Sequence, residues 1–151
     1  MDRERTVATN RRARHDYQIL DRFEAGIALT GSEVKSLRAG RASLAQAFVR
    51  VRDRQAWLEN MHIPPYEQGD KRTHEPLRTR KLLLHRREID RLSATQNEQG
   101  LAIVPMRVYF SHGLAKVELA LGRGKRQFEK RHAIAKRESE REIARAAGRR
   151  R

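Results

Sequence analysis

Six histidines, at positions 15, 62, 74, 85, 112 and 132, are the first side chains to consider for acid–base or metal chemistry. None has a spacing such as HExxH, in which two imidazoles on one helix face reach a single metal ion. The chain has no cysteine, which excludes disulfides, thiolate metal ligands and cysteine nucleophiles. No Ser/His/Asp arrangement and no paired-carboxylate motif stands out. We therefore expect no metal, no cofactor and no catalytic residue.

Two carboxylates stand among basic residues, and their chemistry depends on what they face. Glu24 lies in the stretch FEAG and Glu33 in GSEVKSLR. A carboxylate among arginines most often balances charge. It can also accept a hydrogen bond from the amino or imino group of a base, a contact that phosphate-binding side chains cannot replace. The sequence leaves both interpretations open.

The stretch GRGK at residues 122–125 is too short to match the phosphate-loop pattern GxxxxGK[ST]. It predicts a turn that leaves the last strand, or alternatively a pair of cations, Arg123 and Lys125, that hold a phosphate backbone. Phe128 follows in a segment with nothing else to pack on. It is either an exposed aromatic or a stacking platform for a base, worth roughly 1–3 kcal/mol if used.

The segment KRESEREIARAAGRRR at residues 136–151 carries one isoleucine and no other large apolar side chain. Arg137, Arg141, Arg145 and Arg149 recur every four residues and would form one basic row on a helix. An isolated helix of this length is marginal in water. Two interpretations stay open: a solvated, frayed terminus, or a segment that is mobile when free and becomes helical on an anionic groove.

Charge and composition indicate the kind of partner. Of the 151 residues, 34 are Lys or Arg and 19 are Asp or Glu, so the net charge is +15. Charge of this size indicates a polyanion such as RNA, DNA or an anionic membrane. Most of the basic residues are arginines, which fork onto phosphate and stack on bases, so nucleic acid is favoured over membrane. We expect no membrane span and no secretory signal, and therefore a cytoplasmic protein.

The hydrophobic pattern predicts three regions: a basic arm at residues 1–14, a folded domain at 15–124 and a basic tail at 125–151. Residues 17–29 alternate as in a long strand. GSEVKSLRAG predicts a short helix, with Ser32 as its N-cap and Gly40 at its end. AFVRVR and AWLENMHI predict two strands that a hairpin turn joins at DRQ.

The second half of the domain is predicted by the same patterns. The Pro-rich stretch at 64–79 indicates a long loop, and LLLHRREIDRLSATQ a helix. LAIVPMRVYF and LAKVELAL predict two strands, with Pro105 at an edge or a bulge. Small antiparallel sheets hide their edges by closing up. We therefore expect a mainly β fold: a small closed antiparallel barrel of the oligonucleotide-binding type with two or three short flanking helices.

Several stretches taken together resemble one family. TNRRARHDYQILDRFEAGIALTGSEVKSLRAG, RTRKLLLHRREIDRL, GLAIVPMRVYF and GLAKVELALGRGKRQFEKR are similar to the SsrA-binding proteins, also called small protein B, over about residues 9–131. The resemblance implies a protein that binds transfer-messenger RNA and brings it, charged with alanine, to bacterial ribosomes stalled on broken messages. It also implies a tail that is mobile in solution and becomes helical in the empty messenger path of the small subunit.

The resemblance assigns roles position by position. In the body it implies that these residues bind transfer-messenger RNA: Asn10, Arg11, Arg14, Glu24, Glu33, Lys35, Arg38, Lys81, Leu83, Arg123 and Lys125. Toward the tail it implies that these residues bind the ribosome: Gly124, Phe128, Glu129, Lys130, Arg131, Arg137, Arg141 and Arg145. Glu129 replaces the aspartate that the family normally has, which keeps the charge but lengthens the reach. Phe128 stands where the family commonly has tyrosine, so stacking survives but a phenolic hydrogen bond does not.

The leading hypothesis is a monomeric, non-enzymatic RNA-binding adaptor of ribosome rescue. Its expected partners are transfer-messenger RNA and the 70S ribosome, at the small-subunit decoding centre and mRNA channel. The first alternative is a structural ribosomal protein or general RNA-binding protein with a basic extension, which stable presence in purified subunits would favour. The second is a nuclease that uses His and Glu side chains, which metal-dependent RNA cleavage would favour.

Overall fold

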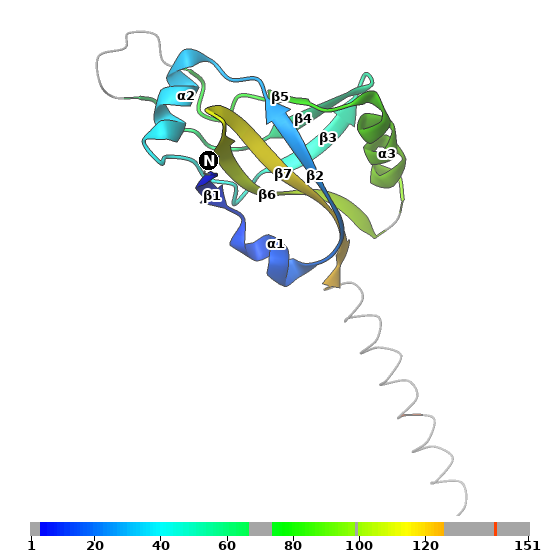
Figure 1. Cartoon of the computed structure of the whole chain (residues 1–151). Coiled ribbons are helices and arrows are strands. Elements are labelled where there is room, and N and C mark those ends of the chain that lie inside the picture. Colours follow the sequence, from blue (N-terminus) through cyan, green and yellow to red (C-terminus); the bar gives the residue numbers. More distant parts are fainter. Residues whose placement is uncertain (1–3, 67–73, 99, 126–140, 142–151) are drawn as a thin grey trace, which may run out of the picture.

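The computed structural model describes residues 4–66, 74–98, 100–125 and 141, and Figure 1 shows the arrangement of their helices and strands. The strands are β1 (Arg5–Thr9), β2 (Tyr17–Ile27), β3 (Phe48–Arg52), β4 (Gln55–Glu59), β5 (Arg80–Leu83), β6 (Leu101–Ser111) and β7 (Leu114–Gly124). The helices are α1 (Arg11–Asp16), α2 (Gly31–Arg38) and α3 (Arg86–Gln96). The fold is therefore mainly β, as the sequence predicted.

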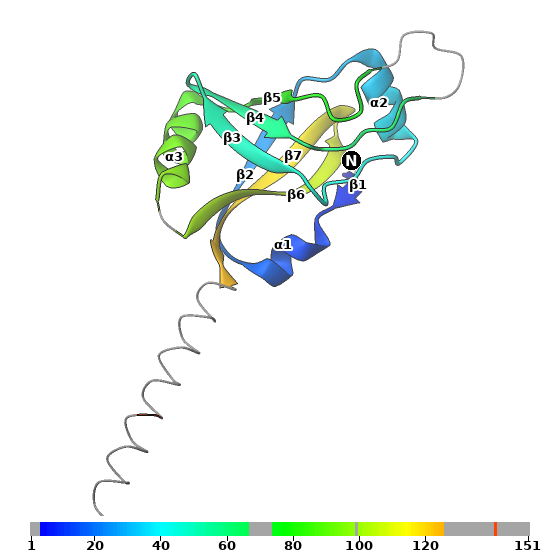
Figure 2. The same cartoon turned by 180° about the vertical axis from the view of Figure 1, so that it is seen from behind.

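All seven strands belong to one antiparallel sheet in the order β1-β6-β7-β2-β5-β4-β3, which Figure 2 shows from behind. Within the described residues, no hydrogen-bonded ladder joins β3 back to β1 or β6, so the sheet is not closed. The predicted closed barrel is thus not confirmed. At the end of α3, the side chain of Gln96 donates to Val51 O (2.9 Å) and accepts from Val51 N (3.0 Å). This amide covers the free edge of β3, where a closing strand would bond.

The core lies on the inner face of the curved sheet. Alternate residues of each strand point there, such as Ala25 on β2, Leu58 on β4 and Leu82 on β5, and all three are fully or almost fully buried. Helix α2 adds Leu37 and helix α3 adds Leu92. Because side chains alternate along a strand, the residues between these core positions point to the outer face of the sheet. That face carries the candidate site described below.

The predicted first half of the domain is largely found. Strand β2 covers most of residues 17–29, and the predicted helix is α2. Its N-cap is Thr30 rather than Ser32, because the Thr30 hydroxyl accepts from Glu33 N while the Glu33 carboxylate accepts from Thr30 N. This reciprocal pair is a capping box. The DRQ hairpin is also found, with Asp53 and Arg54 as its two turn residues.

The stretch LLLHRREIDRLSATQ differs from the prediction in its first part. Helix α3 begins only at Arg86, and the preceding residues form β5 between β2 and β4. Leu82 is buried while its neighbour Leu83 is 54% exposed, an alternation that belongs to a strand. Pairing with two strands distant in sequence therefore overrides the helical spacing that the leucines also satisfy.

Two elements near the amino terminus were not predicted. Strand β1 pairs with β6, from Arg5 opposite Phe110 to Thr9 opposite Arg107. Helix α1 follows directly and buries only Ala13. Part of the segment predicted as a basic arm is therefore hydrogen-bonded into the sheet as its edge strand.

Candidate nucleic-acid interface

The register of the central strands brings three outer-face positions into one row. Lys116 on β7 lies opposite Gly26 on β2, and Gly26 lies opposite Leu83 on β5. A Cβ added at Gly26 would lie 3.2 Å from the Cβ of Leu83. Glycine therefore leaves the space over β2 that the exposed Leu83 side chain occupies. Two residues along their strands, Glu24 and Lys81 point to the same face.

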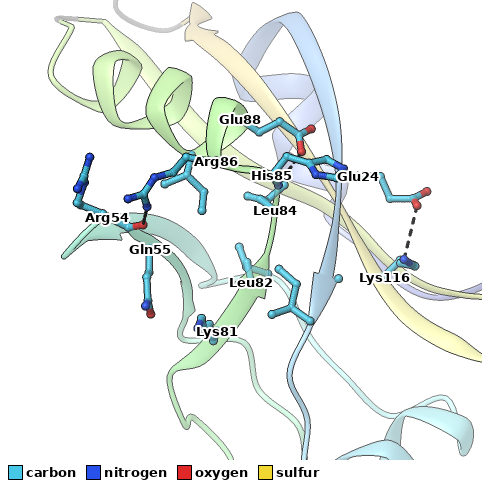
Figure 3. Close-up of a pocket in the computed structure, with 13 residues that line it drawn as sticks. Glu24, Arg54, Gln55, Lys81, Leu82, Leu84, His85, Arg86, Glu88 and Lys116 are labelled. Carbon is cyan, nitrogen blue, oxygen red and sulfur yellow. Dashed lines mark hydrogen bonds and ion pairs between the residues drawn. The ribbon is translucent and has the colours of Figure 1, made fainter.

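This row forms the floor of a groove of about 600 Å³, drawn in Figure 3. The β3–β4 turn and the start of α3 line it from one side, and β2 and β7 from the other. Its lining residues are Glu24, Gly26, Arg54, Gln55, Lys81, Leu82, Leu83, Leu84, His85, Arg86, Glu88, Ile89 and Lys116. Three of the residues predicted to bind RNA, Glu24, Lys81 and Leu83, thus meet in one place.

The groove carries more positive than negative charge. Its cations are Arg54, Lys81, Arg86 and Lys116, and its carboxylates are Glu24 and Glu88. The Glu88 carboxylate caps the start of α3 by accepting a hydrogen bond from His85 N at 3.0 Å. An apolar floor with cations around it suits a ribose–phosphate chain whose bases are turned inward.

Glu24 is the one carboxylate of the groove that is held by side chains from other strands. It accepts a short hydrogen bond from the hydroxyl of Tyr109, and its other oxygen lies 3.9 Å from the Lys116 ammonium. Tyr109 is only 2% exposed, and burial, the hydrogen bond to Glu24 and the charge of Glu24 together raise the pKa of its phenol. The phenol therefore stays protonated and donates. Glu24 is fixed in place between the Tyr109 hydroxyl and the Lys116 ammonium, and Figure 3 shows its contact with Lys116.

A network of side chains supports Tyr109: Arg107 on β6, Glu118 on β7, Thr6 on β1 and Glu4, which directly precedes β1. The guanidinium carbon of Arg107 lies 4.0 Å from the centre of the Tyr109 ring. The same guanidinium donates to Glu118 (2.8 Å) and to Glu4 (3.0 Å), and these hydrogen bonds and charges outweigh burial and raise the pKa of Arg107. The position of Glu24 is therefore linked to the edge strand of the sheet.

Glu33 lies inside the molecule, in contrast to Glu24. Its side chain is fully buried and receives hydrogen bonds from Arg78 (2.6 Å) and from the buried Arg80. Burial alone would raise the pKa of Glu33, but the hydrogen bonds from Arg78, Thr30 N and Arg80 outweigh it and lower the pKa to about 2. Arg80 also donates to Met61 O at 2.6 Å. Glu33 thus ties α2 to β5, the strand that presents Lys81 and Leu83.

Asn10 has two structural contacts at the amino-terminal end. Its side-chain oxygen accepts from Ala13 N at 3.3 Å as the N-cap of α1, and its amide nitrogen donates to Pro105 O at 3.0 Å. Asn10 N also donates to Met106 O at 2.8 Å. These contacts fix α1 against β6. Helix α1 then presents two further residues predicted to bind RNA, the exposed Arg11 and Arg14.

The remaining predicted body residues lie apart from the groove. At the far end of β7, Arg123 is exposed, and the Lys125 ammonium donates to Arg14 O at 3.3 Å. Strand β2 runs nine residues from Tyr17, opposite Gly124, to Gly26 in the groove, or roughly 30 Å at the usual rise per residue. On α2, the exposed Lys35 and Arg38 form a third group. Contact with all three groups requires a large folded ligand rather than a single nucleotide.

Several residues were missed by sequence reasoning: the groove residues Arg54, Arg86 and Lys116, and Tyr109, which holds Glu24. The alternation in LAKVELAL places Lys116 on the outer face of its strand, but no local pattern tells which strand lies beside it. Arg54 and Arg86 meet because the carbonyl of Arg54 accepts from the Arg86 guanidinium at 3.1 Å.

The predicted tail residues fall mostly outside the described part of the chain, namely Phe128, Glu129, Lys130, Arg131, Arg137 and Arg145. Gly124 ends β7, and Arg141 is exposed. In the part of the chain that the structure describes, no group of three or more His, Asp or Glu side chains is placed to hold a metal ion. None of the helices in the same ranges is long and apolar enough to cross a membrane.

Comparison with known proteins decides the family. The family model described as SmpB protein matches residues 7–149. The chain belongs to the SmpB family. Among curated relatives, an SsrA-binding protein of Salinispora tropica is 62% identical over 146 residues, covering 97% of this chain and 92% of the relative. An SsrA-binding protein of Desulforudis audaxviator is 60% identical over 144 residues, covering 95% of this chain and 94% of the relative.

A solved structure of the SmpB family has the same architecture. It is described as "tmRNA-SmpB: a journey to the center of the bacterial ribosome", and its matching chain is 52% identical with a TM-score of 0.66. The match covers 78% of this chain and 82% of that chain. SmpB relatives are thus similar in both sequence and fold.

Proposed function

We propose that this SmpB-family protein binds transfer-messenger RNA and delivers it to stalled ribosomes for trans-translation. One observation carries the proposal: a chain 60% identical to an SsrA-binding protein over nearly its whole length gathers Glu24, Lys81 and Leu83 in one cationic groove. The related solved structure, described as tmRNA-SmpB at the bacterial ribosome, supports the same two partners.

Two kinds of contact bind the RNA in the groove: cations attract its phosphates, and a carboxylate accepts a directed hydrogen bond from a base. Lys81, Arg86 and Lys116 attract phosphates and so position the RNA without reading its sequence. Glu24 repels phosphate and favours a base that offers an N–H donor, and Tyr109 holds it for that contact. Because looped RNA exposes its bases, a few contacts of this kind select for the shape of the RNA.

Other parts of the chain make the remaining contacts with the RNA and the ribosome. Helix α1 and the end of β7 hold a second part of the same RNA through Arg11, Arg14, Arg123 and Lys125. The tail, residues 125–151, senses the empty mRNA channel of the small subunit, with Phe128 stacking on exposed ribosomal RNA; its Arg residues support that role. The protein acts in the cytoplasm as a non-enzymatic adaptor. Its curved sheet serves as an oligonucleotide-binding-like body.

A competition experiment tests the proposed function. Labelled transfer-messenger RNA is displaced by unlabelled transfer-messenger RNA or by ordinary transfer RNA, at one stated salt concentration, because affinity for RNA depends on salt. We expect the wild-type protein to prefer transfer-messenger RNA, and Glu24→Ala to lose more affinity for it than for transfer RNA. Equal affinity of the wild type for both RNAs would overturn the proposal.

Removal of the tail tests the division of labour. All seven strands in the part of the chain that the structure describes end by Gly124, so truncation after this residue leaves that sheet complete. We expect the truncated protein to keep most of its RNA affinity and to lose peptide tagging on stalled ribosomes in a reconstituted translation system. Loss of RNA binding and tagging to the same extent would contradict separate roles for body and tail.

A further inference from the structure

The turn between β3 and β4 has an unusual residue for its geometry. It is a two-residue turn, since Arg52 pairs with Gln55, and both turn residues have positive φ: 53° at Asp53 and 60° at Arg54. Turns of this kind favour Asn-Gly or Asp-Gly, because glycine adopts positive φ without steric cost. Asp53 fits this preference, whereas Arg54 occupies the glycine position. The turn therefore carries backbone strain at Arg54 that glycine would relieve.

The position of Arg54 in the fold indicates what the side chain is for. It lies at one end of the groove beside Arg86, which donates to its carbonyl oxygen at 3.1 Å (Figure 3). Among the residues that the structure describes, no carboxylate forms an ion pair with the guanidinium of Arg54 or Arg86, or with the Lys81 ammonium. Arg54, Arg86 and Lys81 therefore line the groove without an acidic ion-pair partner among the described residues.

We propose that Arg54 and Arg86 together bind one phosphate group of the RNA backbone at this end of the groove. The inference rests on the proposed function and adds a site to it. A guanidinium presents a fork of donors that matches phosphate oxygens, and a phosphate between two such groups relieves their mutual repulsion. The Arg86 guanidinium donates to the backbone carbonyl of Arg54, so it is held beside the turn that carries the Arg54 side chain before RNA binds. The strained turn is the cost of this arrangement.

The proposal makes stability and RNA affinity change in opposite directions. Arg54→Gly removes both the strain and the cation. We expect the urea midpoint of unfolding to rise, because glycine suits the positive φ. We expect affinity for transfer-messenger RNA to fall about tenfold, as for the loss of one charged hydrogen-bonded contact. Because one phosphate contact is lost, the slope of log affinity against log salt should become shallower by about 0.7–0.9.

Two further variants separate charge from backbone effects. Arg54→Lys keeps a cation in the same strained turn and should bind RNA closer to the wild type than Arg54→Gly does. Arg86→Ala should weaken binding on its own but add less than its full effect to Arg54→Gly, since both residues contact one phosphate. Fully additive losses would show that the two arginines do not share a ligand group.

The outcomes distinguish this inference from the function on which it rests. If the wild type prefers transfer-messenger RNA but Arg54→Gly binds it with unchanged affinity and unchanged salt slope, the phosphate site is wrong and the function stands. If Arg54→Gly is less stable than the wild type, the argument from turn strain is wrong. If the wild type shows no preference over transfer RNA, the proposed function fails and this site fails with it.

Discussion

Replacement of the buried Glu33 by glutamine should destabilise the protein in a way that depends on pH. Glu33 is fully buried between Arg78 and Arg80, and the lowered pKa of its carboxyl measures how strongly the folded state favours the charged form. Glu33→Gln keeps the shape of the side chain and removes the charge. Two guanidinium groups then lose their carboxylate, one of them fully buried.

The size of the expected destabilisation follows from the pKa of the Glu33 carboxyl. It falls from 4.5 to about 2 on folding. At 1.36 kcal/mol per pKa unit, this difference corresponds to about 3 kcal/mol of stability. Because the folded-state pKa is the lower one, the contribution is complete above about pH 4.5 and is lost as the pH falls through 2. Removal of one partner of a buried ion pair typically costs about 3–5 kcal/mol, so we expect a loss of this size at pH 7.

Urea unfolding followed by circular dichroism, at pH 7 and at pH 3, measures both the loss and its pH dependence. We expect the difference in unfolding free energy between wild type and Glu33→Gln to be about 2 kcal/mol smaller at pH 3 than at pH 7. At pH 3 the wild-type carboxylate contributes only part of its stabilisation. Arg78→Lys, which keeps the charge but not the fork, serves as a milder variant if Glu33→Gln does not fold. A gap below 1 kcal/mol at pH 7, or one that is the same at both pH values, would refute the reasoning.

Two other variants test the parts that surround the groove. Tyr109→Phe removes the hydroxyl that Glu24 accepts from, so we expect a weaker preference for transfer-messenger RNA over transfer RNA, measured by competition. It should cause no further loss in a Glu24→Ala background, and an equal loss in both backgrounds would show that Tyr109 does not act through Glu24. Gln96→Ala removes two hydrogen bonds to the edge of β3 and should lower the free energy of unfolding by about 1–3 kcal/mol in urea titrations. An unchanged free energy would mean that water satisfies this edge equally well.

Patterns of neighbouring residues correctly predicted the helices and strands that those residues largely determine by themselves. The alternation in YQILDRFEAGI predicted β2 because one face of that strand is partly or fully buried while the other is mostly exposed. The helical spacing in REIDRL gave α3 because Ile89 and Leu92 do pack on the core. Asp53 and Arg54 marked a hairpin turn through their position between two alternating strands.

Elements that depend on distant partners were not predictable in this way. The stretch RTVAT is short and half-exposed, and it becomes β1 only because β6 lies beside it. Glu33 was open to interpretation as a base contact because the arginines that bury it lie 45 and 47 residues further along the chain. The resemblance to the family supplied Glu24, Lys81 and Leu83, but their meeting in one groove follows from strand register alone.

The order of the strands has a consequence for how this protein is made. Strand β2 pairs along most of its length with β7, from Tyr17 opposite Gly124 to Gly26 opposite Lys116, and β1 pairs with β6. A nascent chain that leaves the ribosome at about 5–20 residues per second therefore holds β1, and all of β2 except the end that pairs with β5, without partners for roughly 5–20 s. Before β6 and β7 are made, the β3–β4 hairpin can form, and β5 can join it to Gly26 and Ile27 of β2. Until translation is nearly complete, the apolar side chains of β1 and β2 stay exposed. The nascent chain then avoids aggregation only through chaperones or low concentration.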